Sequence, residues 1–262
     1  MTTVMFPGIR AGIIKDLIAL FEKMDVETAL TYFTEDGLYR FGNYPPAIGK
    51  AAIRQATTAS HLDQIKGISF DIKAMWENAD AVICEMDVNY IRNDNTVLTL
   101  PCTDIFRMEG ELIREMLVYM DASPLFAPAE QTQTQAPVST PSTNSLLDLA
   151  KRALAAVEAN NVEEYVSFFT EDAIYKISNN PPVIGPQGIR EFATPVMQMF
   201  PTVTHDVMSM WVIDNTVVGE MFVNYTRNDG KLFKLPCLDI IRFEGNKIKE
   251  FQAFIDASPA FS

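Results

Sequence analysis

The sequence predicts an α+β fold that occurs in two tandem copies, each with helices covering one face of a bent antiparallel sheet. The first reason is an internal repeat: Phe33–Asp36 recurs as Phe169–Asp172, and Asp121–Pro124 recurs as Asp256–Pro259. The second is a set of apolar residues at helical spacing early in each copy. The third is a series of β-branched, strand-like runs separated by turn residues in the remainder of each copy.

The repeated unit is far longer than a solenoid repeat, so it represents a whole domain. We assign residues 1–127 to the first domain, 128–144 to a linker and 145–262 to the second domain. The linker is rich in Gln, Thr, Ser and Pro and has little apolar surface to bury. It is therefore predicted to be flexible and partly extended.

Each copy begins with predicted helices. Asp25 is the expected N-terminal cap of a second helix over 26–32. A third helix is predicted over 50–61, with its partner over 186–199, where Pro195 predicts a kink or an early end. The apolar residues that predict the first helix of each copy are Ile13, Ile14, Leu17, Ile18 and Phe21, and then Leu146, Leu149, Ala153, Leu154 and Val157.

Strand-like runs make up the rest of each copy. Gly37–Phe41 is a short strand that a Pro-Pro pair ends. Four longer runs follow at 68–76, 82–92, 97–108 and 112–120. Asn, Asp and Gly residues separate these runs, as is typical of hairpin turns. Consecutive hairpins predict an antiparallel meander.

Composition and charge limit the class of partner. The 262-residue chain has a formal net charge of -13, so neither nucleic acid nor an anionic membrane is expected as a partner. No apolar run is long enough to cross a bilayer, and Pro7 and Gly8 interrupt the apolar core that an export signal would need. Three cysteines without a close pair favour a reducing compartment, so we expect a cytoplasmic protein.

Neither a metal nor an organic cofactor is expected. His61 and His205 do not occupy equivalent positions, so no His/Cys metal cluster and no Ser-His-Asp set is supported by both copies. Cys102 and Cys237 are equivalent. They are interpreted as small apolar residues of the core or as residues that line a pocket.

A carboxylate in the middle of a strand is the strongest functional signal. Asp104 lies in the run Leu100–Arg107, and Asp239 lies in the equivalent run Leu235–Arg242. Burying a carboxylate is unfavourable unless it is paired or stays protonated. The repeated position therefore indicates either a pocket with acid–base chemistry or a structural pair with an arginine or a helix end, and both interpretations stay open.

With these motifs, the chain resembles the nuclear transport factor two-like superfamily, in particular its SnoaL-like, limonene epoxide hydrolase-like and ketosteroid isomerase-like branches. The resemblance rests on the Phe-Thr-Glu-Asp motif followed by Tyr39, on Pro45-Pro46 and Gly49, on the Asp104 strand and on the ending 119–121. It implies two cone-shaped domains, each a curved mixed or antiparallel sheet wrapped around helices. It also implies that the two domains pair within the chain as a pseudo-dimer, with a further homo-oligomer as an open alternative.

The ketosteroid isomerase branch implies a protonated Asp at the positions of Asp104 and Asp239. Its general-base Asp, however, falls at Phe41 and Ile177, and lysines stand near the position of its oxyanion tyrosine. With two of three parts missing, steroid-type isomerisation is not expected.

The epoxide hydrolase branch implies an Asp-Arg-Asp relay that aligns a water molecule. Tyr39 matches its tyrosine, and Asp87 and Asp121 match its two acids. Glu85 stands at the position of the arginine, and Phe222 replaces the first acid in the second copy. The sequence therefore does not reproduce the complete relay in either copy.

The candidate site residues follow from the mid-strand acids and from these matches. Because Glu85, Asp87 and Asn89 alternate along one strand, they share one face and converge on the pocket if that face is concave. The predicted catalytic residues are Asp104, Asp239, Asp121, Asp256, Glu85, Glu220 and Asp87. The predicted substrate-binding residues are Tyr39, Tyr175, Asn89, Asn224, Trp76 and Trp211.

Each candidate also has a structural alternative. Asp121 and its copy precede Ala-Ser-Pro and are favoured as caps of that turn. Glu85 and its copy can form cross-strand pairs with arginines. The two tryptophans are favoured as core or interface residues, and Tyr39 and its copy fit equally well as core aromatics.

The first hypothesis for function is a cofactor-independent enzyme of cyclase, isomerase or epoxide hydrolase type, which uses carboxylate acid–base chemistry on a small lipophilic substrate. The second is a non-catalytic module of the same fold that binds a small molecule or another protein. A third assigns activity to the first domain alone, because Asp87 has Phe222 as its counterpart.

Overall fold

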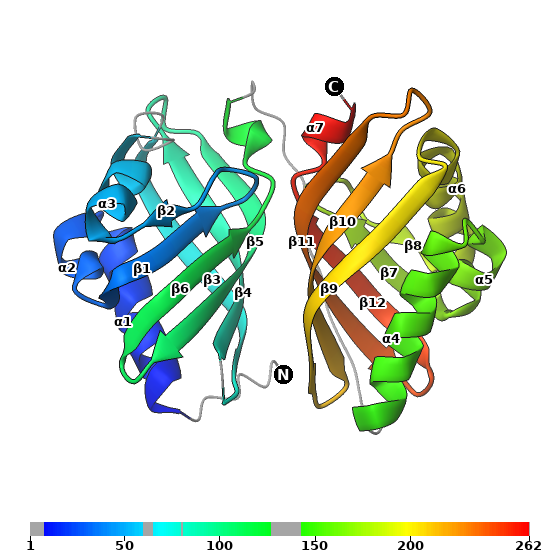
Figure 1. The fold of residues 1–262 in the computed structure, drawn as a ribbon, viewed down its shortest axis with the longest axis horizontal. Coiled ribbons are helices and arrows are strands. Elements are labelled where there is room, and N and C mark those ends of the chain that lie inside the picture. Colours follow the sequence, from blue (N-terminus) through cyan, green and yellow to red (C-terminus); the bar gives the residue numbers. More distant parts are fainter. Residues whose placement is uncertain (1–7, 60–64, 80, 127–142, 262) are drawn as a thin grey trace. The chain divides into compact units, whose positions relative to one another are not determined.

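A computed structural model of the chain describes residues 8–59, 65–79, 81–126 and 143–261. It divides into two compact units, Met1–Gln131 and Thr132–Ser262, which we call domain 1 and domain 2. Both have the same order of elements (Figure 1), which confirms the α+β class and the tandem duplication. Most of the predicted linker lies outside the described residues, and its last two residues already belong to the first helix of domain 2.

In domain 1 the long strands come last, as predicted. The elements in chain order are α1 (Ile9–Glu22), α2 (Val26–Leu30), β1 (Phe33–Phe41), β2 (Ala47–Ile48), α3 (Lys50–Ala59), β3 (Ile65–Glu77), β4 (Ala81–Arg92), β5 (Val97–Glu109), β6 (Leu112–Tyr119) and the 3-10 turn η2 (Ser123–Phe126). The four long strands lie within a few residues of their predicted bounds. Strand β1 begins at Phe33 rather than at Gly37.

The strands of domain 1 form an open six-stranded sheet in the order β2-β1-β6-β5-β4-β3. All neighbours are antiparallel except β1 and β6, which are parallel, so the sheet is mixed. Register shifts between Ile72 and Ala74 in β3 and between Arg107 and Met108 in β5 mark irregular points, which bend and twist strands. Figure 1 shows α1, α2 and α3 on one side of this sheet.

Side-chain hydrogen bonds hold the first two helices in place. Asp25 Oδ1 accepts a hydrogen bond from Thr28 N at 3.1 Å, which caps α2 as predicted. Glu22 Oε1 accepts a hydrogen bond from Phe70 N at 3.1 Å, which ties the end of α1 to β3. These two bonds position the helices over the inner face of the sheet, the face that they cover.

A proline stands inside the strand that carries the mid-strand acid. Pro101 of β5 lies opposite Asp87 of β4, whereas β6 pairs with β5 only from Thr103 onward. The proline therefore lies where β5 has a single neighbour, which is where a strand tolerates a missing N–H group. Pro236 of domain 2 is placed in the same way, because pairing with the following strand starts at Cys237.

Domain 2 repeats the architecture. Its elements are α4 (Thr143–Glu158), α5 (Val162–Ser167), β7 (Phe169–Ile177), β8 (Val183–Ile184), α6 (Gly185–Met199), β9 (Thr202–Ile213), β10 (Thr216–Thr226), β11 (Leu232–Glu244), β12 (Lys247–Ile255) and α7 (Ser258–Phe261). The sheet order is β8-β7-β12-β11-β10-β9. Helix α6 continues through Pro195 to Met199, so the predicted early end is wrong.

Each domain has its own apolar core between the helices and the inner face of its sheet. In domain 1, Leu17 of α1, Ile53 of α3 and Phe106 of β5 are fully buried members of this core. In domain 2, Leu146 and Ile241 hold the same kind of position. Burial of such side chains contributes about 1.5–3 kcal/mol each, and this packing stabilises the walls of the site described below.

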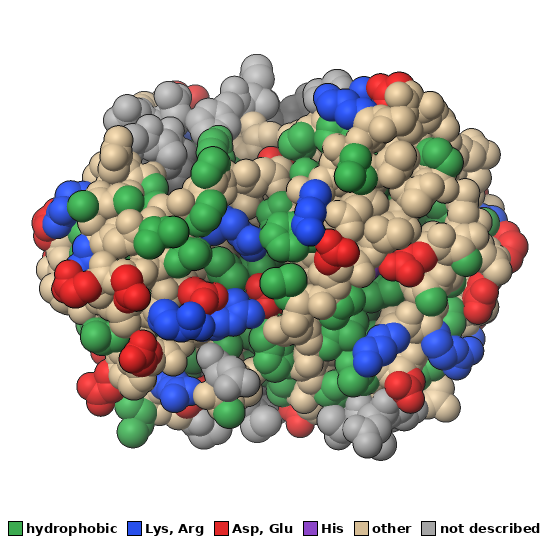
Figure 2. All heavy atoms as spheres, in the orientation of Figure 1, with side chains coloured by type: hydrophobic (Ala, Val, Ile, Leu, Met, Phe, Trp, Pro, Cys, Tyr) green, Lys and Arg blue, Asp and Glu red, His purple; other side chains and the backbone are tan. Residues whose placement is uncertain are grey.

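Charged side chains of both signs are interspersed on the face shown in Figure 2. Ion pairs form within each domain, for example between Lys50 and Glu35 at 2.7 Å and between Lys234 and Asp206 at 2.6 Å. Among the described helices, none combines the length and the apolar character needed to cross a membrane.

Candidate functional site

Domain 1 contains an apolar cavity of about 110 Å³ between its helices and the inner face of its sheet. The wall is built mainly from aliphatic, aromatic and methionine side chains of α1, α2, α3 and the long strands. The lining residues with polar side-chain atoms are Tyr39, Thr57, Tyr90, Cys102 and Asp104, and no Lys, Arg or His is found among the described residues that line it. The cavity therefore offers an apolar environment with one carboxyl group.

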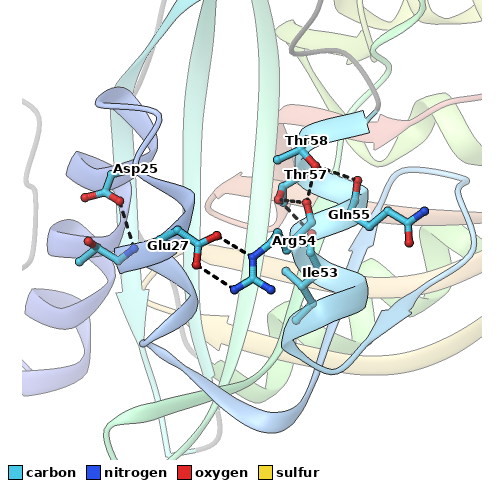
Figure 3. A network of polar contacts seen from close by, with 8 residues as sticks. Asp25, Glu27, Ile53, Arg54, Gln55, Thr57 and Thr58 are labelled. Atoms are coloured by element: carbon cyan, nitrogen blue, oxygen red, sulfur yellow. Dashed lines mark hydrogen bonds and ion pairs between the residues drawn. The ribbon is translucent and has the colours of Figure 1, made fainter.

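An ion pair fixes the two helices that form one wall of the cavity. Arg54 of α3 donates two hydrogen bonds to the Glu27 carboxylate of α2, at 2.6 and 2.8 Å (Figure 3). The hydroxyl of Thr57, also on α3, donates to the main-chain oxygen atoms of Ile53 at 2.9 Å and Arg54 at 3.1 Å. Because its hydroxyl is satisfied within the helix, Thr57 adds little polarity to the cavity.

Asp104 of β5 is the acid that lines the cavity. It is only 5% exposed, and residue pairing places it opposite Cys84 of β4 and Val118 of β6, on the inner face of the sheet. The thiol of Cys102 donates a hydrogen bond to Asp104 Oδ1 at 3.3 Å. Among the described residues this weak donor is the only hydrogen-bond partner of the carboxyl group.

Burial controls the protonation of this acid. Desolvation raises the pKa of Asp104 to about 7, while the hydrogen bond from Cys102 acts in the opposite direction. The acid is thus protonated well above the pH at which an exposed Asp ionises. Near neutral pH both the acid and the carboxylate are populated, as acid–base chemistry requires.

Tyr39 of β1 is the predicted site residue that the structure brings to the same cavity. It is 9% exposed, and its hydroxyl has no hydrogen-bond partner among the described residues. Desolvation and the neighbouring charge of Asp104 raise the pKa of Tyr39, so the hydroxyl keeps its proton. Because the side chain is buried and its hydroxyl has no partner among the described residues, this hydroxyl indicates a position for a ligand.

Tyr90 of β4 is a lining residue that sequence reasoning missed. Its hydroxyl donates to the sulfur of Met120 at 3.5 Å, and burial raises the pKa of Tyr90. The alternation of β4 contained the signal, because Tyr90 and Val88 share the face opposite to Asn89.

The three polar residues of β4 lie on the other face of the sheet, so the expectation that they converge on the pocket is wrong. Glu85 pairs with Thr103, and each is one residue away from the inner-face pair Cys84 and Asp104. The two-residue period therefore turns Glu85, Asp87 and Asn89 away from the cavity. Glu220 of domain 2, opposite Leu238, is likewise out of step with Asp239.

These outer-face residues have partners there. Asp87 forms an ion pair with Lys73 at 2.6 Å. Asn89 donates to Asp71 at 2.9 Å and accepts from Thr99 at 2.6 Å. In domain 2 the side chain of Asn224 donates to Thr204 Oγ1 at 3.3 Å.

Asp121 and Asp256 organise the turns that follow their strands. Asp121 Oδ1 accepts a hydrogen bond from Ser123 N at 2.9 Å. Asp256 Oδ1 accepts from Ser258 N at 3.0 Å and from its hydroxyl at 2.6 Å. Both acids therefore cap the turn after the strand, which is the structural alternative given above. Asp121 is not among the residues that line the cavity.

The tryptophans lie on outer faces and are half-buried. Trp76 is opposite Ile83, whereas its neighbour Met75 is opposite Cys84 on the inner face. Trp211 is opposite Val218 of β10, one residue out of step with Gly219, which pairs with Asp239 on the inner face. Trp76 does not line the cavity of its domain.

Domain 2 contains the same acid, thiol and tyrosine. Asp239 is 3% exposed, accepts a hydrogen bond from the thiol of Cys237 at 3.3 Å, and has a pKa raised to about 7 by burial. Tyr175, the counterpart of Tyr39, is enclosed by other aromatic rings. The ring centroids lie 5.1 Å away for Phe251, 5.7 Å for Phe192, 5.9 Å for Phe169 and 6.2 Å for Tyr165.

No set of three His, Cys, Asp or Glu side chains able to hold a metal ion is found among the described residues. The chemistry that the site can perform with its own groups is proton transfer by Asp104 and hydrogen bonding by Tyr39 and Tyr90.

Comparison with family models identifies the family. The model of the SnoaL-like domain matches residues 14–116 and 150–251, which together make up more than half of the chain. The chain therefore belongs to the SnoaL-like domain family and carries one such domain in each half. This confirms the resemblance drawn from the sequence motifs. No curated protein matches the sequence.

Solved structures match one domain at a time. An uncharacterised cystatin-fold protein from Novosphingobium aromaticivorans is 23% identical, covers 41% of this chain and 96% of its own, and has a TM-score of 0.37. A hypothetical protein with a ketosteroid isomerase-like fold from Catenulispora acidiphila, in complex with trimethylamine, is 17% identical, covers 42% of this chain and 87% of its own, and has a TM-score of 0.40. A proposed SnoaL-like polyketide cyclase from a Jannaschia species is 13% identical, covers 50% of this chain and 95% of its own, and has a TM-score of 0.42.

Proposed function

We propose that domain 1 binds a small lipophilic molecule and exchanges a proton with it through the carboxyl group of Asp104, without a metal or an organic cofactor. Membership of the SnoaL-like family supports a small-molecule-binding or cyclase/isomerase kind of function. The observation that carries the proposal is a buried carboxyl group that lines an apolar cavity with only a thiol as its hydrogen-bond partner among the described residues.

The environment of Asp104 suits both directions of proton transfer. With a pKa of about 7, the neutral acid can donate to a carbonyl oxygen, and the carboxylate can remove a proton from the carbon beside that carbonyl. The carboxylate is poorly solvated in an apolar wall, which strengthens it as a base. The Tyr39 hydroxyl remains protonated and is free to stabilise negative charge that develops on a substrate oxygen.

This arrangement favours an isomerase or cyclase type of reaction over epoxide hydrolysis. A single carboxyl group can take a proton from one atom of a substrate and return it to another. An epoxide hydrolase relay needs further carboxylates to hold a water molecule, and Glu85 and Asp87 lie on the opposite face of the sheet. Domain 1 is therefore proposed as the catalytic domain on the evidence of its cavity and not of Asp87.

Hydrogen–deuterium exchange tests this proposal without knowledge of the natural substrate. Cyclohexanone, a neutral ring ketone, is incubated in D2O with the wild-type protein, and loss of the hydrogens beside the carbonyl is followed by proton NMR. We expect Asp104→Asn to lower the enzymatic exchange rate by about 10²–10⁴-fold, because it removes the base. Asp239→Asn is the matched control and is expected to keep the wild-type rate.

Two results would count against catalysis. If Asp104→Asn exchanges as fast as the wild-type protein, the carboxyl group is not the base. If the wild-type protein binds cyclohexanone, seen as ligand line broadening, and does not accelerate exchange, domain 1 is a binding module of the same fold.

A further inference from the structure

One position on the second helix differs between the domains in a way that bears on the ligand. Helix α5 of domain 2 is the counterpart of α2, and each is capped by the residue before it, Asn161 in one case and Asp25 in the other. In this alignment Tyr165 of α5 stands where α2 has Ala29. Ala29 lines the cavity of domain 1, so domain 1 has a methyl group where domain 2 has a phenol ring.

The Tyr165 ring contacts the counterparts of residues that line the cavity. Its centroid lies 5.2 Å from that of Phe169 and 6.2 Å from that of Tyr175, both in edge-to-face geometry. These two residues correspond to Phe33 and Tyr39, which line the cavity in domain 1. Tyr165 therefore occupies the space in domain 2 that is empty in domain 1.

Tyr165 also places a second phenol beside the tyrosine and the acid of domain 2. Burial raises the pKa of Tyr165, and the neighbouring Tyr175 and Asp239 raise it further, so all three groups lie close together. Tyr39 has no tyrosine in the equivalent place, because Ala29 stands there. The side chain of Tyr165 thus shows what kind of molecule this fold accommodates beside the tyrosine and the acid.

The size of the cavity agrees with a single ring. Its volume is about 110 Å³. An apolar protein cavity of about 150 Å³ holds benzene, so the two volumes are comparable. A phenol is uncharged at neutral pH, which fits a wall without a cationic side chain, whereas an anion would meet the Asp104 carboxylate without compensation.

We propose that the cavity of domain 1 takes a neutral monocyclic phenol, with its ring in the place that Tyr165 fills in domain 2 and its hydroxyl directed at Tyr39 and Asp104. The proposal rests on the proposed function for the location of the site and specifies the class of ligand. In domain 2 the equivalent ligand position is then filled by the side chain of Tyr165.

The test is the number of binding sites for 4-methylphenol, which is the tyrosine side chain as a free molecule. Isothermal titration calorimetry of the full-length protein is expected to show one site for the wild-type chain. Ala29→Tyr fills the cavity from within and is expected to bind none. Tyr165→Ala opens the equivalent space and is expected to bind two.

A second variant tests the hydrogen bond. Tyr39→Phe is expected to weaken binding of 4-methylphenol by about tenfold, because the hydroxyl loses its partner, and to leave binding of toluene unchanged. Circular dichroism and the thermal midpoint of each variant show that it is folded. If Tyr165→Ala does not fold, the loss of the site in Ala29→Tyr decides the question alone.

The outcomes separate this inference from the proposed function. Undiminished binding in folded Ala29→Tyr, or no binding by the wild-type protein at millimolar 4-methylphenol, overturns the phenol assignment. The exchange experiment with cyclohexanone is independent of both results, so proton transfer by Asp104 stands or falls separately.

Discussion

Tyr39 of domain 1 and Tyr175 of domain 2 occupy equivalent places, opposite Met116 and Phe251 of the neighbouring parallel strand. The Tyr175 ring is stacked on Phe251 with a centroid distance of 5.1 Å and an angle of 17°. Met116 is flexible and lines a cavity instead. The same backbone thus supports a cluster of aromatic rings around the tyrosine in domain 2 and an apolar cavity beside the tyrosine in domain 1.

Some positions around the cavity have smaller residues in domain 2. Val118 and Thr57, which line the cavity of domain 1, are replaced by Ala253 and Ala193. We infer that these smaller residues offset part of the volume that Phe251 and Tyr165 add. Such an offset agrees with the close packing of protein interiors, in which total volume is more constrained than the identity of each side chain.

The comparison shows that two equally buried acids can lie in different surroundings. Asp104 and Asp239 have similar burial, the same thiol partner at the same 3.3 Å and the same raised pKa of about 7. They differ in the space beside the tyrosine. The cavity, and not the carboxyl group, is therefore the feature on which our proposal for domain 1 depends.

The largest effect on stability is expected from Phe251→Ala. Phe251 is 5% exposed and contacts the rings of Tyr175 and Phe169, so its loss leaves a new cavity and costs about 3–5 kcal/mol. Met116→Ala is the matched change in domain 1. It is expected to cost about 2–3 kcal/mol, the lower part of the usual range, because Met116 already borders empty space.

Urea denaturation of the two variants measures this difference. If the two changes destabilise their domains equally, the cavity of domain 1 is filled by side-chain rearrangement in solution, and the contrast between the domains is lost.

The next effect concerns pH and is expected to be equal in the two domains. An Asp in the unfolded chain has a pKa of about 3.9, and the folded pKa of Asp104 is about 7. Between these values the folded state holds a proton that the unfolded state has released. The free energy of unfolding therefore falls as the pH rises, by at most about 1.4 kcal/mol per pH unit for each such carboxyl group.

Asparagine variants isolate this contribution. Asp104→Asn and Asp239→Asn are each expected to make the fall between pH 5 and pH 7 less steep, by a similar amount. Denaturation with urea at several pH values gives the slopes. The exposed acid Asp229, whose pKa is lowered to about 2 by Arg227, titrates below this window and leaves the comparison intact. A slope that neither variant changes would show that both carboxyl groups are solvated.

The fold could be predicted from the helical spacing of apolar residues and from the strand-like runs that turn residues separate. The helical spacing of Leu17 and its neighbours and the hairpin turns gave elements close to those observed. The parallel pairing of β1 with β6 was not contained in the local pattern, because it depends on how the first strand packs against the last one. Helix α6 continues through Pro195 because packing of its apolar side outweighs the loss of one hydrogen bond.

The site was predicted in part. Asp104 and Tyr39 were identified from sequence motifs, and the structure places both side chains at the cavity. The residues of β4 were assigned to the wrong face, because alternation shows which residues share a face and not which face is concave. The cavity itself could not be predicted, since it depends on differences such as Ala29 against Tyr165, which the repeat reveals only once the contacts are known.

The smallest effect is expected at the turns after the last strands, where the domains are alike. Asp121→Ala and Asp256→Ala each remove a cap from a main-chain N–H group and are expected to cost about 1 kcal/mol. Since neither acid is part of the proposed site, neither variant is expected to change exchange of cyclohexanone or binding of 4-methylphenol. Asp121→Asn, which keeps an accepting oxygen, is the control for the turn. Slower exchange in a stable, folded Asp121→Ala protein would make Asp121 part of the proton path, and domain 1 would then use a second carboxyl group that the cavity wall does not include.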